Sequence, residues 1–459
     1  MEIINYSEEH RIFRNSLRRY LEKEVIPHVE EWEEAGIVPR SAWKGMGEQG
    51  FLCMGVPEEY GGLGADFLYS VIVIEEMVRT NHSGLAAALH SDIIVPYIVA
   101  FASEEQKRKY LPGCISGDII TAIAMTEPNA GSDLAAMRTT AVEGGGETSR
   151  GSGSFALANV GGTAGTGGTG NAGNNGNNGA GNAGKSAEAG YNVNNRNHGN
   201  NTVKDDSNVS KGAAGAATAS TGDSDYFVIN GQKTFISNGI NCDLLILAAK
   251  DPAEQNPHAA VDLFLVEAGT KGFEKGKKIK KVGWHSQDTA ELFFTDCRIP
   301  KANRMGDKGT GFLKLMLKLQ QERLVCAIAA VAAAELILEI TIQYCKERTA
   351  FGRPISKFQH TQFELVEMAT EVKLGRTFLD KLIVDHMEGR NIVVEVSMAK
   401  YWTTDMACRV ADRGVQLFGG YGYCEEYPIA RAWRDTRVMR IFAGTNEIMK
   451  SIAARFMGL

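Results

Sequence analysis

The sequence has no CxxC pair and no group of histidines and cysteines at metal-ligand spacing. Its eight cysteines are scattered along 459 residues. Structural zinc sites need closely spaced Cys or His ligands, and disulfide scaffolds are typical of small secreted chains. Both classes are therefore excluded. We expect no metal site, and we expect reduced, structural cysteines in a cytosol-like compartment.

Long apolar runs are also missing. The longest, VCAIAAVAAAELIL from Val325, contains Glu335 and is shorter than the roughly 20 apolar residues that cross a bilayer. The first residues, MEIINYSEEHRIFRN, have no apolar core, and their acidic side chains argue against a transit peptide. A net charge of -6 gives no sign of nucleic acid or an anionic membrane as partner. These absences predict a soluble protein with no membrane span. We expect it in the cytoplasm, or in the mitochondrial matrix if the chain is a processed form.

Three segments differ in the spacing of their apolar residues. Residues 1–118 have helical spacing behind Ser or acidic starts, as in SEEHRIFRNSLRRYLEKEV. Residues 119–300 have short β-type runs, such as DLLILAAK and VDLFLVE, separated by turn signals. Helical spacing returns in residues 301–459. We therefore predict an α+β protein with an N-terminal helical domain, a middle β-domain and a C-terminal helical domain.

A segment of unusual composition interrupts the β-domain at about residues 143–225. It is rich in Gly, Asn, Ala and Ser, as in GGTAGTGGTGNAGNNGNNGAGNAG, and nearly lacks large apolar residues. Such a segment cannot offset its ordering entropy, so we predict a disordered insertion. A tolerated surface expansion is favoured over a partner-binding or phase-separating tract. Two N-glycosylation triplets, at Asn200 and Asn208, are discounted because no secretory signal accompanies them.

Two polar turns in the β-domain are candidate binding elements. AMTEPNAGSD, from Ala124, ends a β-run and presents Thr126 and Ser132 beside free backbone N–H groups, which can bind a polar heterocycle or a phosphate. An ordinary turn would have the same sequence. In NGQKTFISNG, Phe235 could stack on a flat cofactor or belong to the core, and Ser237 adds a hydroxyl.

The C-terminal region has two further glycine-containing links. QLFGGYGY, from Gln416, suggests a dinucleotide fingerprint only superficially, because helical sequence precedes it where that motif needs a strand. A backbone that can approach a pyrophosphate remains possible. In RIFAGTNEIM, Thr445 and Asn446 are good helix N-caps and Glu447 falls in the first turn, so the turn could receive an anion or a carbonyl. Ala443, at the turn itself, can do no chemistry.

A carboxylate lies on the apolar stripe of the helix predicted from Gly311. The stripe runs at steps of three or four residues through Leu315, Leu319, Glu322, Cys326 and Ala329. A buried ionised carboxylate is costly unless it has a partner or a purpose. Glu322 could form an ion pair with Arg323 or with a cation of another helix, or it could be a functional base. The Ala residues that follow could leave room for a ligand or could serve close helix packing.

In this order, these motifs resemble those of the acyl-CoA dehydrogenase family over nearly the whole chain outside the insertion. AMTEPNAGSD and QLFGGYGY…RDTRV…AGTNEIM are similar to its two signature blocks, and VGWHSQDTAELFFTDCRIP and RTAFGRPI to intermediate ones. The resemblance implies a middle β-barrel-like domain and a C-terminal four-helix bundle, with FAD bound between them and partly across a subunit boundary. It implies FAD contacts from these residues in chain order: Met125, Thr126, Gly131, Ser132, Phe235, Ile236, Ser237, Arg348, Phe351, Gln359, Gln416, Leu417, Phe418, Gly419, Gly420, Thr445, Asn446 and Glu447. Phe235 departs from the Trp often found at its position, a change that should preserve stacking.

The resemblance also implies the reaction. Members of the family remove the proton alpha to a thioester and pass a hydride from the beta carbon to flavin. In many members the base precedes the Gly-Thr of the last motif, where this chain has Ala443. A long-chain and isovaleryl subgroup has it instead on the helix, in an xxER motif that QQERL matches. Glu322 is accordingly assigned as the base, and substrate contacts are assigned to Ser132, Arg323, Ala443 and Gly444.

The resemblance predicts a dehydrogenase of long- or branched-chain acyl-CoA in fatty acid or branched-chain degradation. It predicts electron-transfer flavoprotein as the electron acceptor and a homotetramer as the assembly. Two alternatives are an acyl-CoA oxidase, disfavoured because the chain without its insertion is shorter than typical oxidases, and a catalytically silent acyl-CoA- or protein-binding scaffold.

Overall fold

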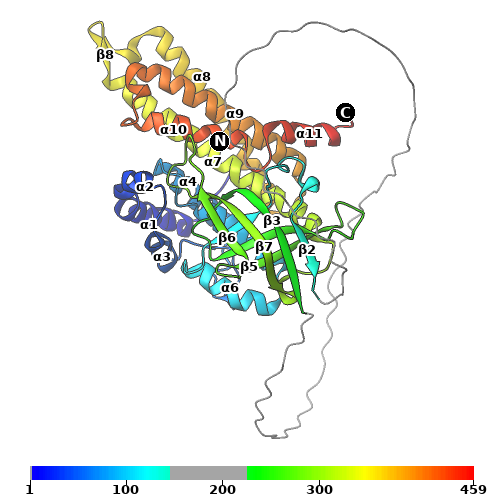
Figure 1. Ribbon diagram of the computed structural model, residues 1–459. Coiled ribbons are helices and arrows are strands. Elements are labelled where there is room, and N and C mark those ends of the chain that lie inside the picture. Colours follow the sequence, from blue (N-terminus) through cyan, green and yellow to red (C-terminus); the bar gives the residue numbers. More distant parts are fainter. Residues whose placement is uncertain (1–2, 145–224) are drawn as a thin grey trace, which may run out of the picture. The chain divides into compact units, whose positions relative to one another are not determined.

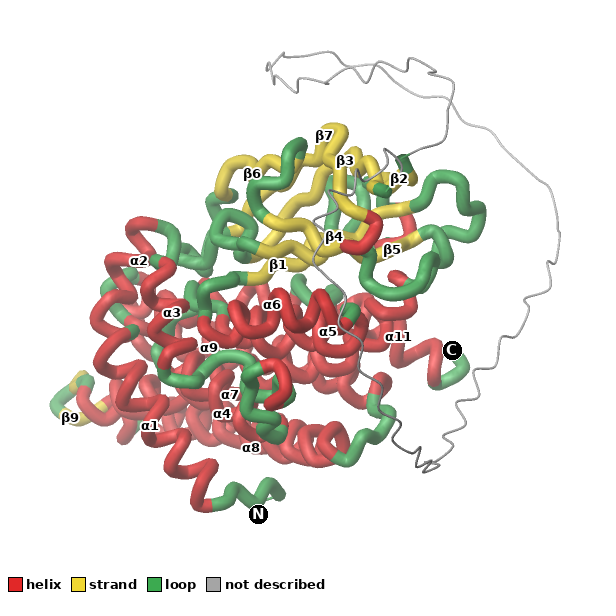
Figure 2. Tube along the Cα trace, turned by 90° about the horizontal axis from the view of Figure 1, so that it is seen from below, coloured by secondary structure: helices red, strands yellow, loops and turns green. Residues whose placement is uncertain are grey.

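The computed structural model describes residues 3–144 and 225–459. The predicted disorder of residues 143–225 and the two glycosylation triplets therefore fall almost entirely outside the described residues. The described parts fold together into one compact unit of helices and a single large sheet. Figure 1 shows its elements in chain order, and Figure 2 shows the strands of the large sheet gathered on one side of the helical layers.

The N-terminal part is helical, as predicted. Ser7 and Ser103 each form a capping box at a helix start, with His10 and Gln106 respectively. A π-helical turn, Leu89–Ile94, leads directly into α5. The helices are α1 (Glu8–Glu24), α2 (Val29–Ala35), α3 (Arg40–Glu48), α4 (Phe67–Arg79), α5 (Val95–Phe101) and α6 (Glu104–Ser116).

The middle part is a seven-stranded sheet in the order β1-β4-β2-β3-β7-β6, with β5 paired to β4. Its strands are β1 (Thr121–Ala124), β2 (Thr140–Glu143), β3 (Tyr226–Ser237), β4 (Leu244–Lys250), β5 (Val261–Glu267), β6 (Phe273–Lys278) and β7 (Thr289–Pro300). Successive side chains of a strand point to opposite faces. In β4, Leu244 and Ile246 join the core shared with the N-terminal helices, whereas Leu245 and Leu247 join a core inside the sheet. The sheet is thus fixed to the helices by its own buried face.

The C-terminal part is a bundle built around three long helices. They are α7 (Gly311–Glu347), α8 (Gln359–Met387) and α9 (Val393–Phe418), followed by α10 (Pro428–Thr436) and α11 (Asn446–Phe456). A small hairpin of β8 (Thr349–Ala350) and β9 (Arg353–Pro354) joins α7 to α8. Val71 and Ile74 of α4 share the core of this bundle, while Ile72 and Val73 of the same helix face the N-terminal core. The α+β fold and its three-part arrangement are therefore confirmed.

Helix α7 is long and apolar enough to cross a membrane by length and composition alone. The sequence argument against a membrane span used only the apolar run from Val325, whereas the helix that contains this run is longer. The structure corrects that argument from length. However, 61% of its most apolar window is buried within the described fold. Its alanines account for this: Ala327, Ala330 and Ala334 are fully buried in the bundle core. The Ala-rich run therefore serves close helix packing, one of the two alternatives that the sequence left open.

Candidate active site

The polar turn after β1 is anchored to β3 by a buried ion pair. The Nζ atom of Lys233 lies 2.8 Å from Oε1 of Glu127 and donates to the carbonyl of Met125 at 3.1 Å. Glu127 also accepts backbone hydrogen bonds from Arg138 and Thr139. Burial opposes ionisation of Glu127, but Lys233 and these donors outweigh it and lower the pKa of the carboxyl. The turn that contains Thr126 is thus fixed, and the backbone N–H of Thr234 donates to its carbonyl at 2.9 Å.

An aromatic ring faces outward at the end of β3. The register with β7 shifts between Lys233 and Ile236, and within this irregularity Phe235 has a φ of 57° and a relative exposure of 65%. A non-glycine residue at positive φ is uncommon and marks a specialised position. The next residue, Ile236, is 2% exposed in the core of the sheet, so only its backbone can reach a ligand. Phe235 therefore belongs to the surface and not to the core, and its ring is accessible to a flat ligand.

Glu322 lies on the buried side of α7, as its spacing predicted, with 4% exposure. Its Oε1 accepts a 2.6 Å hydrogen bond from the phenol of Tyr97, on α5. Burial raises the pKa of Glu322 to about 7, against the opposing effects of Tyr97, Arg323 and Lys318. Glu322 forms no ion pair with any residue that the structure describes, and Arg323 instead donates to Ser397 at 3.3 Å. The geometry therefore favours the functional base over the structural ion pair.

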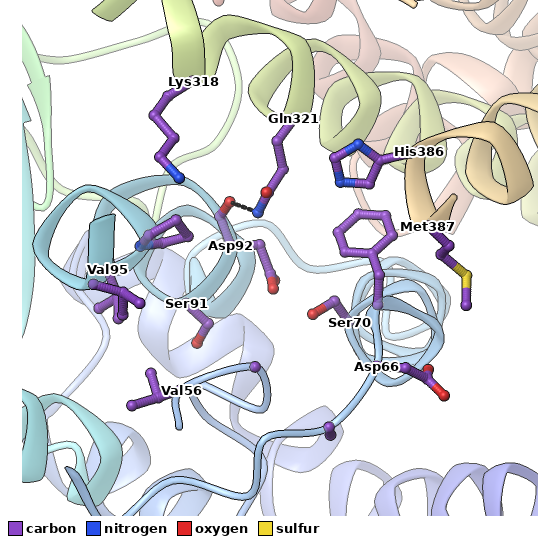
Figure 3. A pocket seen from close by; sticks show the side chains of 15 residues that line it. Val56, Asp66, Ser70, Ser91, Asp92, Val95, Lys318, Gln321, His386 and Met387 are labelled. Atoms are coloured by element: carbon purple, nitrogen blue, oxygen red, sulfur yellow. Dashed lines mark hydrogen bonds between the residues drawn. The ribbon is translucent and has the colours of Figure 1, made fainter. Parts of the chain in front are cut away.

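A cavity of about 380 Å³, shown in Figure 3, is lined by chain neighbours of Glu322 and Tyr97 but not by these two residues. We call it the Asp92 cavity. Lys318 and Gln321 reach it from the turn of α7 that carries Glu322, and Val95, Pro96 and Val99 from the turns around Tyr97. Its other lining residues are Gly55, Val56, Ala65, Asp66, Phe67, Ser70, Ser91, Asp92, His386 and Met387.

The turn before α11 is hydrogen-bonded to a buried lysine of α9. Lys400 of α9 is 0% exposed, and its Nζ donates to the carbonyl of Gly444 at 2.7 Å and to Oδ1 of Asn446 at 3.2 Å. Thr445 is the N-cap of α11, and its hydroxyl accepts from the N–H of Ile448. Ala443 has a φ of 50°, and Glu447 is exposed. The turn is thus strained and rigid, with its free N–H groups at a helix N-terminus, where an anion or carbonyl is favoured.

A second cavity, of about 460 Å³, lies at the end of α9. Arg348, Leu417, Phe418, Gly419 and Gly420 line it, together with Tyr344, Ile355, Tyr421 and Cys424. The glycine run follows α9 and continues as a 3-10 turn, Gly419–Tyr423, so the rejection of a strand-based dinucleotide motif is confirmed. The structure does not place Phe351, Gln359 or Gln416 among the lining residues, and Phe351 is 95% exposed.

The open glycines of this cavity fit a phosphate-bearing ligand. A Cβ atom added to Gly419 or Gly420 would meet no atom within 4 Å, and the same is true of Gly131 in the turn after β1. Gly420 does not have positive φ, so neither its conformation nor its packing requires glycine. Because these backbones are exposed where a side chain would project, a ligand can approach them closely. Arg348 adds a cation beside them, 5.4 Å from the ring centre of Tyr421.

Several residues of the site were not found from the sequence. Lys400 lies on a buried stripe of α9 with Val396, Thr403 and Ala407, so the spacing argument that found Glu322 applies to it equally. Tyr97, Lys233 and Asp92 gave no comparable signal, because their partners lie far away in the chain. Trp284, in the block VGWHSQDTAELFFTDCRIP, packs its ring edge-on against Phe442, with 5.4 Å between ring centres, a contact between distant segments that the sequence does not indicate.

Comparison with known proteins gives one consistent result. Three family models match: "Acyl-CoA dehydrogenase, N-terminal domain" over residues 7–118, "middle domain" over 206–297 and "C-terminal domain" over 309–458. The chain is 38% identical to the mitochondrial long-chain specific acyl-CoA dehydrogenase of Sus scrofa, covering 98% of this chain and 86% of that one. It is 30% identical to the mitochondrial isovaleryl-CoA dehydrogenase of Solanum tuberosum, covering 96% and 89%. Among solved structures, an acyl-CoA dehydrogenase from Geobacillus kaustophilus is 47% identical, with a TM-score of 0.80 and 99% of both chains covered.

Proposed function

The chain belongs to the acyl-CoA dehydrogenase family, and on this premise we propose that it oxidises long- or branched-chain acyl-CoA to trans-2-enoyl-CoA with Glu322 as the base. Members of the family are FAD-dependent oxidoreductases that act on CH–CH bonds. The observation that carries the proposal is the buried Glu322 carboxylate, which has a hydroxyl partner and no ion-pair partner in the part of the chain that the structure describes.

Proton removal requires a base of suitable strength. The α-proton of a thioester is weakly acidic, so a carboxylate of ordinary pKa is a poor acceptor for it. Burial raises the pKa of Glu322 to about 7, close to the operating pH at which general-base catalysis is most effective. The Tyr97 phenol restrains the carboxylate in one orientation, and burial raises the pKa of Tyr97 itself, so the phenol stays protonated. Glu322 thus takes the α-proton while the Tyr97 hydroxyl stays hydrogen-bonded to its Oε1 atom.

The residues around the two turns and the second cavity fit FAD. Phe235 offers a stacking face, Thr126 and Ser132 lie on the anchored turn, and Gly419 and Gly420 leave room for phosphates beside Arg348. When bound, FAD supplies the acceptor for the hydride from the beta carbon. Ser132, Arg323, Ala443 and Gly444 are the proposed substrate contacts. Ala443 offers no carboxylate, which leaves the base role to Glu322.

The proposed acyl preference has two supports. The chain resembles relatives named for long-chain and for isovaleryl substrates. The Asp92 cavity, of about 380 Å³, is lined by Lys318 and Gln321 from the turn of α7 that carries the base, and its size is in the range of small-molecule sites.

We further propose electron-transfer flavoprotein as the acceptor and a homotetramer as the assembly. Exposed apolar side chains support the assembly: Phe351 on the hairpin after α7, and Phe363, Val366 and Leu374 along α8. Large exposed apolar patches mark interaction sites. A neighbouring subunit at this hairpin would cover Phe351, which the family resemblance assigns to the FAD contacts.

The test is anaerobic titration of the purified, flavin-containing protein with acyl-CoAs of short, branched and long chain. We expect flavin bleaching by long or branched substrates. Glu322→Gln should retain FAD but bleach 10²- to 10⁴-fold more slowly, the usual contribution of a general base. Glu339→Gln is the matched control, because the same substitution on the same helix affects only an exposed pair with Arg79.

Each alternative has its own outcome. Bleaching that survives Glu322→Gln would remove Glu322 as the base. Rapid reoxidation of the bleached flavin by air would indicate an oxidase. Bound flavin that no acyl-CoA bleaches would indicate a silent scaffold.

A further inference from the structure

The Asp92 cavity has a polar wall that the proposed reaction does not use. Asp92 is 5% exposed, and its side chain points into the cavity between Ser70 and Ser91 (Figure 3). It forms no ion pair with any described residue. The other charged or titratable groups of the lining are Lys318 of α7, His386 of α8 and Asp66 before α4. A carboxyl group is thus buried in a chamber with room for a ligand.

The backbone directs Asp92 toward this chamber. It lies in the π-helical turn Leu89–Ile94, a rare conformation often found at functional sites. The Nε2 of Gln321 donates to the carbonyl oxygen of Asp92 at 2.7 Å, which fixes the turn against α7 (Figure 3). The preceding two side chains have partners in the fold: His90 pairs with Thr121 at 2.7 Å, and the hydroxyl of Ser91 accepts from the N–H of Cys53 at 2.9 Å. Asp92 is the side chain left for the cavity.

The cavity lies where an acyl tail would extend. Lys318 is one helical turn before Glu322, and Gln321 is adjacent to it; both line the cavity. Burial lowers the pKa of Lys318, while the Glu322 carboxylate opposes this effect, so the two groups are within electrostatic reach. On the other wall, Pro96 precedes Tyr97, the partner of Glu322. A substrate whose α-carbon lies at Glu322 can therefore place its distal chain in the Asp92 cavity.

The polar wall of the Asp92 cavity should distinguish acyl chains that carry a hydroxyl group from those that do not. An unsubstituted alkyl tail in the cavity would offer no hydrogen bond to the Asp92 carboxyl beyond the one that Ser70 supplies, so part of its hydrogen-bonding capacity would stay unpaired. A buried polar group without a hydrogen bond costs roughly 1–3 kcal/mol. A tail with a hydroxyl group restores that bond. Sites that bond a substrate hydroxyl reject the analogue without it far more strongly than apolar pockets discriminate by size. A neutral donor fits this buried wall better than a charged one, because a second charge would have to be desolvated there.

We infer that Asp92 is a specificity residue that selects acyl-CoA substrates with a hydroxyl group on the distal part of the acyl chain. The inference rests on the proposed function, because it needs Glu322 to fix the position of the thioester. Burial, opposed by Ser70, raises the pKa of Asp92 to about 7. The Asp92 carboxyl should therefore become ionised as the pH rises through about 7.

The test uses matched pairs of unsubstituted and ω-hydroxylated acyl-CoAs of eight to sixteen carbons, with kcat/KM measured on the flavin-loaded enzyme. We expect the wild type to prefer the hydroxylated member of at least one pair by tenfold or more, and Asp92→Leu to abolish that preference. Asp412→Leu, at an exposed position of α9, is the control and should keep it. Equal preferences in the wild type and Asp92→Leu would overturn the inference, as would a wild type that prefers the unsubstituted member of every pair.

Asp92→Asn keeps the size of the side chain and one acceptor oxygen, so it tests the inference even if the leucine variant does not fold. An ionised Asp92 is a stronger acceptor and excludes apolar tails more strongly. The wild-type preference should therefore rise as the pH passes about 7 and stay flat in Asp92→Asn. Titration of Glu322 cancels in the ratio, because both substrates use the same base. A ratio that follows pH identically in both enzymes would refute the role of Asp92. Failure of the wild type to oxidise any acyl-CoA would refute the proposed function itself.

Discussion

The phenol of Tyr97 and the carboxylate of Glu322 are joined by a 2.6 Å hydrogen bond between two buried side chains 225 residues apart in the chain. Burial favours the neutral acid at Glu322, and the phenol favours the carboxylate. These effects oppose each other, and together with the charges of Arg323 and Lys318 they leave the pKa at about 7. Removing the phenol should therefore change the strength of the base without removing the base.

Tyr97→Phe should shift the pH profile of kcat/KM to higher pH. A hydrogen bond to a charged group contributes about 1.5–3 kcal/mol, and one pKa unit corresponds to about 1.4 kcal/mol. We expect the midpoint of the rise with pH to move up by about one to two units, with activity lost at all pH values below the new midpoint and little changed above it. Tyr110→Phe is the control, because it removes a similar bond to Glu267 away from the site. An unchanged midpoint in Tyr97→Phe would show that the Tyr97 phenol does not lower the pKa of Glu322.

Lys400→Met should loosen the turn that contains Gly444 and Asn446. The substitution removes the lysine donor from the Gly444 carbonyl and leaves Oδ1 of Asn446 with Thr404 alone, at roughly 1–3 kcal/mol, in a segment with strained backbone at Ala443. We expect a lower melting temperature and a lower kcat/KM, measured by calorimetry and steady-state kinetics. Lys373→Met, at an exposed position of α8, should change neither. If Lys400→Met lowers the melting temperature but keeps the wild-type kcat/KM, then Lys400 has a structural role only.

The sequence was most informative for features that depend only on residues within one helix or strand. The stripe on α7 predicted the burial of Glu322, which the structure confirms, because helical spacing alone fixes which face a residue occupies. The N-cap at Thr445 was predicted for the same reason, since capping depends on neighbouring residues. The α+β fold also followed from local spacing. The assigned roles of the site residues remain predictions.

Other features depended on contacts between distant segments and could not be read from the chain. Whether Phe235 stacks or is buried was open, because a strand pattern does not reveal the irregularity that gives it positive φ. Nothing near Tyr97 indicates a partner on α7. The Asp92 cavity requires the ends of α4, α7 and α8 to meet, which only tertiary packing decides.

The Glu127–Lys233 pair should behave as one unit. Both side chains are buried, and loss of one partner leaves an uncompensated charge at about 3–5 kcal/mol. Glu127→Gln and Lys233→Met should each lower the free energy of unfolding by that amount in urea titrations. The double variant should lose clearly less than the sum, because no lone charge remains. Additive losses would mean that the pair is not coupled and that the turn is anchored by its backbone bonds alone.

Two neighbouring glycines separate ligand binding from folding. A methyl group on Gly420 would project into open space, whereas one on Gly422 would lie 2.4 Å from the carbonyl oxygen of Val415. Gly420→Ala should therefore leave the melting temperature of the flavin-free protein unchanged and reduce the increase that added FAD produces, because that increase follows FAD affinity. Gly422→Ala should lower the melting temperature without FAD. A Gly420→Ala protein with a full FAD-dependent increase would show that the open backbone at Gly420 does not contact the cofactor, and the phosphate site would then have to lie elsewhere.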